Sequence, residues 1–166
     1  LLPTVKDLYP DAKVLMCVRD IGWIIDSFEV LHRKNPYSYS RIFTPEENIN
    51  VYTRAEALLK NDSTLGFAYN NLKQAITGEH KNSIMVIEYD HLVKNPEVIL
   101  KAIYNFINEP YFPHDFNDVE ASYDEFDDEV QLPGLHTTRK KVEYIERQTI
   151  LPPDIWNRVN GMEVWK

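Results

Sequence analysis

An arginine and a serine eight residues apart are of the right types to bind a phosphate together. Arg19 follows the apolar run Val14–Val18, and Ser27 lies in the helix-like segment after it. A continuous apolar run is typical of a buried parallel strand, and open α/β sheets bind ligands at the carboxyl ends of their strands. A guanidinium and a hydroxyl placed there predict a site where several donors hold one phosphate. Surface ion pairs of Arg19 with Asp20 or Asp26 are the alternative, and the spacing alone leaves the two about equally open.

A second apolar run, residues 83–89, ends in Tyr89 and is followed by Asp90. An Asn-Pro pair at residues 95–96 then begins a clear helical pattern. Tyr89 is placed to stack on a base, and Asp90 to hold the loop. An ordinary junction of strand, loop and helix is the alternative, and it would be favoured if this motif stood alone.

Apolar periodicity indicates strands that alternate with helices along the chain. Strands are expected at residues 13–18 and 83–89, and helices at 22–34, 65–77 and 96–107. Another helix is expected at residues 45–59, because Thr44, Pro45 and Glu47 have the spacing of a capping box. Short helices are expected at residues 119–126 and 155–160.

This alternation predicts the α/β fold class, with a parallel sheet flanked by helices. Two strands are too few for a stable parallel sheet, because each buried strand needs neighbours on both sides. We therefore expect residues 1–166 to form a single domain that is incomplete at its N-terminus. The missing N-terminal part of that domain is then a partner that the chain requires.

Composition narrows the classes of protein further. The 166 residues are 43% hydrophobic and 27% charged, enough for one domain with a core. The net charge of −8 argues against nucleic-acid binding. No run approaches the roughly 20 apolar residues of a membrane-spanning helix. The single cysteine, Cys17, is expected to be buried, which favours a cytoplasmic protein. No metal site is predicted, because the histidines lack the spacing of metal ligands.

The two motifs together resemble the sulfotransferase family. Its members have a strand, then Arg, then Ser eight residues later, which bind the 3′-phosphate of the donor 3′-phosphoadenosine 5′-phosphosulfate. The resemblance covers roughly residues 7–112, with two departures: Ile21 stands where the family often has proline, and His91 where it usually has an acid. The other matching segments are Pro10-Asp-Ala-Lys13, Tyr89-Asp-His-Leu92, Asn95-Pro-Glu97 and Phe106-Ile107.

The resemblance implies a P-loop NTPase-like fold and a role for each matching residue. Arg19 and Ser27 would bind the 3′-phosphate, and Tyr89 would lie near the adenine. The family also closes a late basic loop over this phosphate, for which Arg139 and Lys140 are the candidate cations; a solvated basic turn is the alternative. The family's glycine-rich phosphate loop has no counterpart in this sequence, and its catalytic base is expected before the first residue. No catalytic residue is therefore predicted, and His136 is not nominated.

The predicted function is transfer of a sulfuryl group from that donor to an acceptor hydroxyl or amine, with no metal. A nucleotide-dependent, kinase-like P-loop protein is one alternative. A non-catalytic module that binds a basic protein through the acidic, aromatic residues 111–129 is another. The acceptor itself is not identified by the sequence, and its pocket is expected at residues 37–43 and 112–132.

Overall fold

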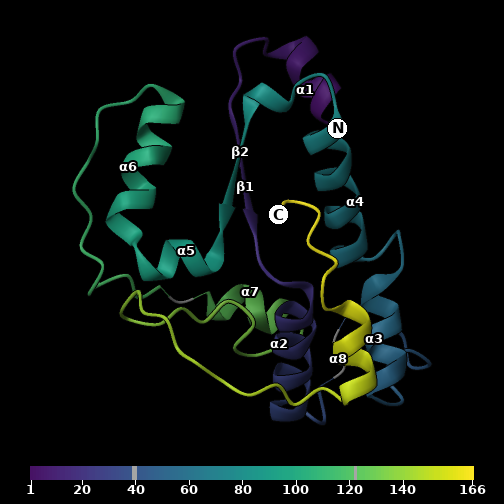
Figure 1. The fold of residues 1–166 in the computed structure, drawn as a ribbon. Coiled ribbons are helices and arrows are strands. Elements are labelled where there is room, and N and C mark those ends of the chain that lie inside the picture. The colour runs from purple at the N-terminus through teal and green to yellow at the C-terminus, as the bar shows by residue number, and fades with distance from the viewer. Residues whose placement is uncertain (39–40, 122) are drawn as a thin grey trace.

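The computed structural model describes residues 1–38, 41–121 and 123–166, and it is a mixed α/β structure (Figure 1). Two parallel strands lie at its centre, with helices on either side and a larger group of helices below. Among the described residues, no helix is long and apolar enough to cross a membrane. In chain order the elements are α1 (Leu2–Leu8), β1 (Val14–Val18), α2 (Ile21–Lys34), α3 (Val51–Leu59), α4 (Thr64–Thr77), the 3-10 helix η1 (Lys81–Ser83), β2 (Ile84–Glu88), α5 (Tyr89–Lys94), α6 (Pro96–Ile107), α7 (Asp124–Glu129) and α8 (Pro153–Val159).

The two strands pair in parallel, as the alternation of strands and helices predicts. Their register runs from Val14 opposite Ile84 to Val18 opposite Glu88. Because both strands end at the same level, the residues that follow them leave the sheet side by side at one edge. This register fixes the position of the candidate site.

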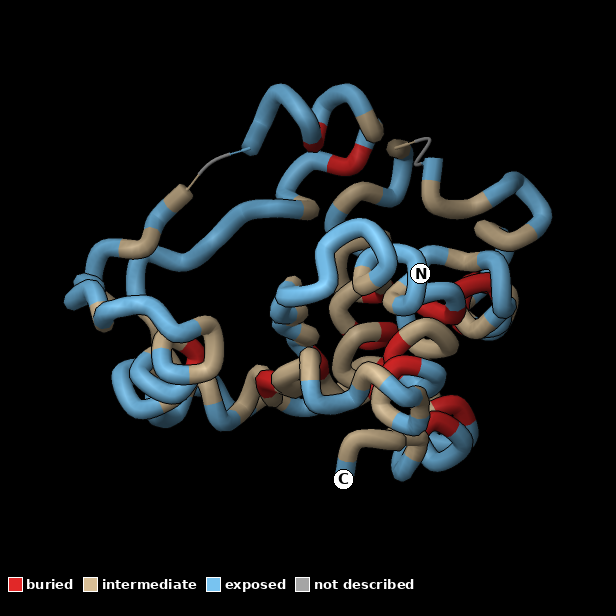
Figure 2. Tube along the Cα trace, turned by 90° about the horizontal axis from the view of Figure 1, so that it is seen from above, coloured by how far each residue is buried: buried red, intermediate tan, exposed pale blue. Residues whose placement is uncertain are grey.

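The main core lies among the helices rather than on the sheet. It joins one face of α2 to α3, α4, α8 and the residue that leads into α8, and in Figure 2 most buried segments lie together in this half of the molecule. Burying each large aliphatic side chain contributes about 1.5–3 kcal/mol, so this cluster holds α2 firmly below the strands. Its buried members are Ile21, Ile25, Ala55, Leu58, Leu65, Leu151, Ile155 and Val159.

A close approach between α2 and α8 completes the core. The edge of the Trp156 ring meets Trp23, with ring centroids 4.8 Å apart. A Cβ atom at Gly22 would lie 2.8 Å from Cζ3 of Trp156 and 3.0 Å from Oδ1 of Asp20. Position 22 therefore requires glycine for this packing, in the turn of α2 that immediately follows β1.

The helix expected at residues 45–59 begins later than predicted, at Val51. Thr44 and Glu47 do exchange the hydrogen bonds of a capping box, but these close only a single turn. Asn50 then takes an extended conformation, and its side chain accepts hydrogen bonds from the amides of Tyr52 and Thr53. This second cap begins α3, so the predicted capping box forms, but the prediction that its helix runs from residue 45 to 59 is wrong.

Differences in the second half of the chain have similar local causes. The expected helix at residues 119–126 is replaced by α7, because the amides of Val119 and Ala121 bond to the remote residues Lys140 and Thr138 and not within a local helix. Residues 89–94, expected to be a strand end and loop, form α5. The last helix, α8, begins two residues earlier and ends one residue earlier than predicted.

The strands are less buried than the continuous apolar runs predicted. Leu15 is 41% exposed and Cys17 is exposed, so the expectation that Cys17 is buried is wrong. Side chains alternate along a strand, and Leu15 and Cys17 share one face. The described part of the chain leaves that face largely open.

Candidate functional site

The register of the sheet places Arg19 and Tyr89 together at the carboxyl edge. Each is the first residue after its strand, and the Arg19 guanidinium carbon lies 4.3 Å from the centre of the Tyr89 ring. A planar guanidinium stacks well on an aromatic face, which holds it without using its hydrogen-bond donors. Burial lowers the pKa of Arg19, and the nearby charge of Arg147 lowers it further. An arginine remains a cation despite such a shift.

Ser27 reaches the same edge from α2. Its hydroxyl donates a hydrogen bond to the Trp23 carbonyl over 2.8 Å, and its oxygen accepts one from Nη2 of Arg147 over 3.0 Å. A serine hydroxyl donates one hydrogen bond and can turn to suit a new acceptor. Ser27 can therefore redirect its proton to a ligand while it still accepts from Arg147.

Arg147 comes from the late segment that crosses α2, 121 residues after its partner Asp26. Its Nη2 lies 2.9 Å from Oδ2 of Asp26, and its guanidinium lies 4.9 Å from the Trp23 ring. Asp26 is only 1% exposed, and its Oδ1 also accepts from Thr149 Oγ1 at 2.8 Å and from the amide of Ile150 at 2.7 Å. This buried carboxylate therefore fixes both the late segment and the direction of Arg147.

Arg19, Ser27 and Arg147 line a cavity of about 340 Å³. Among the described residues that line it, none carries a carboxylate, whereas three carry a positive charge. Ser27, Leu31 and Lys34 are spaced four and three residues apart, so they share the face of α2 that forms one wall. Such a cavity favours an anion with several oxygen acceptors, and a phosphate fits this description. The lining residues are Arg19, Ile24, Ser27, Phe28, Val30, Leu31, Lys34, Gly134, Leu135 and Arg147.

Of the residues predicted from sequence, the structure brings three together. Arg19 and Ser27 line this cation-lined cavity, and Tyr89 stacks on Arg19. Arg139 and Lys140 are exposed and are not among its lining residues, and their binding role stays a prediction.

Sequence reasoning missed Lys34 and Arg147. Lys34 carried a usable signal, because it lies on the same helical face as Ser27. Arg147 carried none, since its partner Asp26 is remote in the sequence and nothing in the spacing separates it from other late basic residues.

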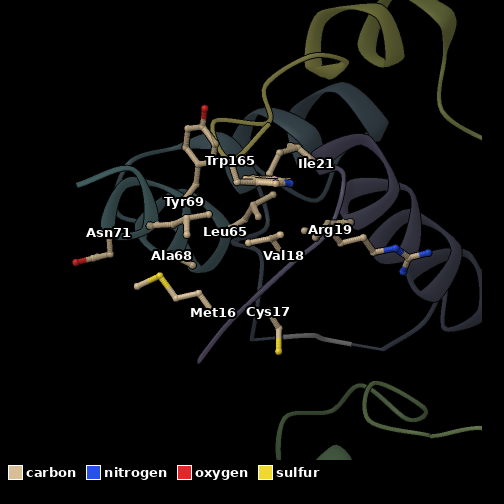
Figure 3. Close-up of a pocket in the computed structure, with 12 residues that line it drawn as sticks. Met16, Cys17, Val18, Arg19, Ile21, Leu65, Ala68, Tyr69, Asn71 and Trp165 are labelled. Atoms are coloured by element: carbon tan, nitrogen blue, oxygen red, sulfur yellow. The ribbon is translucent and has the colours of Figure 1, made fainter. Parts of the chain in front are cut away.

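A second, apolar cavity of about 250 Å³ lies on the other side of the Arg19 backbone (Figure 3). β1, α4 and Trp165, near the end of the chain, enclose it, and the Tyr69 hydroxyl closes one side by donating to the Met162 carbonyl over 2.8 Å. Figure 3 shows the Arg19 guanidinium pointing away from Trp165 and Tyr69. The stem of Arg19 therefore borders the apolar cavity, while its charge belongs to the cation-lined one.

The described residues contain no group of three or more His, Cys, Asp and Glu side chains that could hold a metal ion. The expected acceptor regions are only partly covered, because residues 39, 40 and 122 lie outside the described residues. The site thus offers positively charged and hydroxyl donors that come from the residue after β1, from α2 and from the late segment.

Comparison with known protein families matches residues 1–113 to a model described as the sulfotransferase family, which is more than half of the chain. No curated protein and no solved structure matches the chain. The matched part includes Arg19, Ser27 and Tyr89, whereas Arg147 lies beyond it.

Proposed function

This chain belongs to the sulfotransferase family, and from that premise we propose that it takes part in transfer of a sulfuryl group from 3′-phosphoadenosine 5′-phosphosulfate to an acceptor hydroxyl or amine. The observation that carries the proposal is the cation-lined cavity, in which Arg19, Ser27 and Arg147 converge from three separate segments. In this proposal that cavity binds the 3′-phosphate of the donor, and Tyr89 contributes to the adenine side.

The charges and hydrogen-bond donors of the cavity suit a dianionic phosphate. A hydrogen bond between charged partners contributes about 1.5–3 kcal/mol, and each 1.4 kcal/mol is ten-fold in affinity, so each such contact to the 3′-phosphate raises affinity by about ten-fold or more. Arg19 presents a guanidinium that aromatic stacking has already oriented. Ser27 adds one directional donor, and Lys34 at the rim adds a flexible charge.

The donor supplies the activated sulfuryl group, and the residues of this chain bind and orient it. Transfer of this kind depends on alignment of the reacting groups and on stabilisation of charge, as phosphoryl transfer does. Binding of the 3′-phosphate, which is remote from the reacting sulfur, fixes the position of the nucleotide, so that its binding energy is used to orient the sulfuryl group. No step in this scheme requires a metal.

The open faces of the strands support a further part of the proposal. Leu15 and Cys17 are exposed, although parallel strands are normally covered on both faces and flanked by neighbours. We propose that β1 and β2 belong to a larger P-loop-like sheet within a single domain, of which residues 1–166 form the carboxyl-terminal portion. A glycine-rich loop for the 5′-phosphosulfate would then lie in the rest of that sheet.

The proposal is tested by calorimetry on the complete protein with adenosine 3′,5′-bisphosphate and adenosine 5′-monophosphate. We expect the bisphosphate to bind at least ten-fold more tightly, and Arg19→Ala to remove most of that difference, about 1.5–3 kcal/mol for one charge-assisted contact. Arg158→Ala is the matched control, because Arg158 lies on α8 and pairs with Glu56 outside the cavity. Bisphosphate binding that Arg19→Ala leaves unchanged would refute this assignment, and preference for ATP with Mg²⁺ would favour the kinase-like alternative.

A further inference from the structure

The chain after α8, residues 160–166, folds back over the apolar cavity. In Figure 1 it turns away from α8 and lies between β1 and α4. Trp165 lines the cavity, Met162 packs with it against the main core, and the Tyr69 hydroxyl donates to the Met162 carbonyl over 2.8 Å. The backbone hydrogen bonds within this segment close only isolated turns. A few side-chain contacts therefore decide whether the segment stays in place.

One of these contacts joins two acidic side chains. Asp20 and Glu163 share a hydrogen bond, and the side chain of Glu163 is only 8% exposed. Oδ1 of Asp20 also accepts the Trp23 amide over 3.0 Å, as the cap of α2. Ionised carboxylates can only accept, so the bond between Asp20 and Glu163 exists only while one of them holds a proton. This proton therefore fastens the segment to the start of α2.

The charged groups near this pair offset its charge only in part. Lys166 places Nζ 3.4 Å from Oε1 of Glu163, but its side chain is 59% exposed, so solvent weakens the attraction. Tyr69 is the titratable group that α4 brings to the segment, and its hydroxyl is already bonded there. Arg19 directly precedes Asp20, yet its guanidinium lies at the cation-lined cavity and points away from the segment (Figure 3). Two ionised carboxylates would therefore repel each other at this position.

We propose that residues 160–166 form a pH-sensitive strap over the apolar cavity, held closed by one proton that Asp20 and Glu163 share. In the closed form, the carboxyl group of Asp20 holds the proton and donates it to a carboxylate oxygen of Glu163. When this proton passes to solvent, the two carboxylates repel each other and Trp165 leaves the cavity. Opening uncovers the apolar side chains of Leu65 and Leu72, so pH controls access to the cavity. The inference does not rest on the proposed function, since no step in it involves the nucleotide.

The shared proton gives closure a pH dependence with two limbs. Burial and the bond to Glu163 raise the pKa of Asp20, and the bond from Asp20 lowers the pKa of Glu163. In the open strap, the two groups return towards their ordinary pKa values of 3.8 and 4.5. Above pH 4.5, opening therefore releases a proton, and the ratio of open to closed strap rises up to about ten-fold per pH unit until the raised pKa of Asp20 is passed. Below pH 3.8, opening takes up a proton, so the ratio rises again as pH falls towards the lowered pKa of Glu163.

Two measurements on the complete protein follow the strap. In ¹⁹F NMR with 5-fluorotryptophan, Trp165→Phe assigns the Trp165 signal, and the Trp23 and Trp156 signals report on the core. We expect the Trp165 signal to move towards that of free 5-fluorotryptophan as pH rises above 4.5, while the two core signals stay in place. Hydrogen exchange at the Met162 and Lys166 amides, corrected for the intrinsic effect of pH, detects smaller open populations, and their protection should fall up to about ten-fold per pH unit. A fixed Trp165 signal together with constant protection would overturn the inference.

Conservative variants separate the shared proton from other effects of pH. Asp20→Asn and Glu163→Gln each leave an amide that donates to the remaining carboxylate, so the strap should stay closed above pH 4.5 and the alkaline limb should disappear. Each single variant should keep the acidic limb, because its remaining carboxylate still titrates, and the double variant should show neither limb. Asp154→Asn is the matched control and should keep both limbs, because Asp154 is an exposed carboxylate of α8 that faces the Tyr52 hydroxyl instead of the strap. An alkaline limb that persists in either single variant would also overturn the inference.

Discussion

Replacing Asp26 with asparagine tests the contact that joins the late segment to α2. The substitution keeps the size of the side chain but removes its charge and one acceptor oxygen. Oδ1 accepts from Thr149 and Ile150, whereas Oδ2 accepts from Nη2 of Arg147. In the stable orientation of the amide, its oxygen keeps the first two bonds and its nitrogen faces the guanidinium.

The magnitude follows from these three contacts. A charge-assisted hydrogen bond contributes about 1.5–3 kcal/mol and a neutral one about 0.5–1.5 kcal/mol, so the two retained bonds weaken by about 1 kcal/mol each. The bond to Arg147 is lost, and because that side chain is 30% exposed, solvent limits this loss to about 1 kcal/mol. We therefore expect Asp26→Asn to lower the free energy of unfolding by about 3 kcal/mol. For a chain of this size that is about 6–12 °C in Tm.

Urea denaturation followed by circular dichroism measures this change, with linear extrapolation to zero urea. Glu56→Gln is the control, because it removes an ion pair to Arg158 in which both side chains are about half exposed, and it should cost less than about 1 kcal/mol. In the folded Asp26→Asn variant, affinity for adenosine 3′,5′-bisphosphate should also fall about ten-fold, because Arg147 is no longer directed into the cavity. A loss of stability no larger than that of Glu56→Gln would refute the reasoning that Asp26 anchors the late segment.

Three further predictions concern packing and acid stability. Gly22→Ala should lower the free energy of unfolding, measured by urea denaturation, by about 1–3 kcal/mol, because its Cβ would lie 2.8 Å from the Trp156 ring. When Gly22→Ala is combined with Trp156→Leu, the two losses of stability should not be additive. Burial acts to raise the pKa of Glu29, but hydrogen bonds from two arginines outweigh it and lower that pKa below its ordinary 4.5. The free energy of unfolding should therefore fall as pH drops below about 4.5, and Glu29→Gln should remove this part of the pH dependence. Burial and a hydrogen bond to Glu163 raise the pKa of Asp20, so its contribution to the free energy of unfolding is present at low pH and is lost as pH rises through that pKa. Asp20→Asn keeps a side-chain cap for α2 and should remove this pH-dependent loss of stability. An unchanged dependence of stability on pH would contradict this prediction.

The sequence predicted most of the site because the relevant residues follow directly from strand periodicity. Once two apolar runs are recognised as parallel strands, the residues after them must meet at one edge, and Arg19 and Tyr89 do. Ser27 follows from helical spacing alone. These inferences need only local geometry, which is why the helices at residues 65–77 and 96–107 were also predicted within about one residue.

Features that depend on tertiary partners could not be predicted in this way. The Asp26–Arg147 contact joins residues 121 positions apart, and no local pattern marks either member. The exposure of Cys17 has the same origin, since an apolar run shows that a strand can be buried but not which elements cover it. Thr44 is the opposite case: its local capping pattern was read correctly, but the helix begins only after a second cap, Asn50, six residues later.

The cation-lined cavity contains two buried donors that a bound anion would satisfy. Nε of Arg19 and Nε of Arg147 are both buried, and neither has a hydrogen-bond partner among the described residues. A buried donor without a partner costs about 1–3 kcal/mol, and a protein accepts such a cost more readily at a binding site than in its core. Asp26 offsets only one of these charges, so Arg19 relies on the Tyr89 ring. A net charge of −8 therefore does not prevent anion binding, because the field inside the cavity is set by the three cations that line it and not by the sum over the chain.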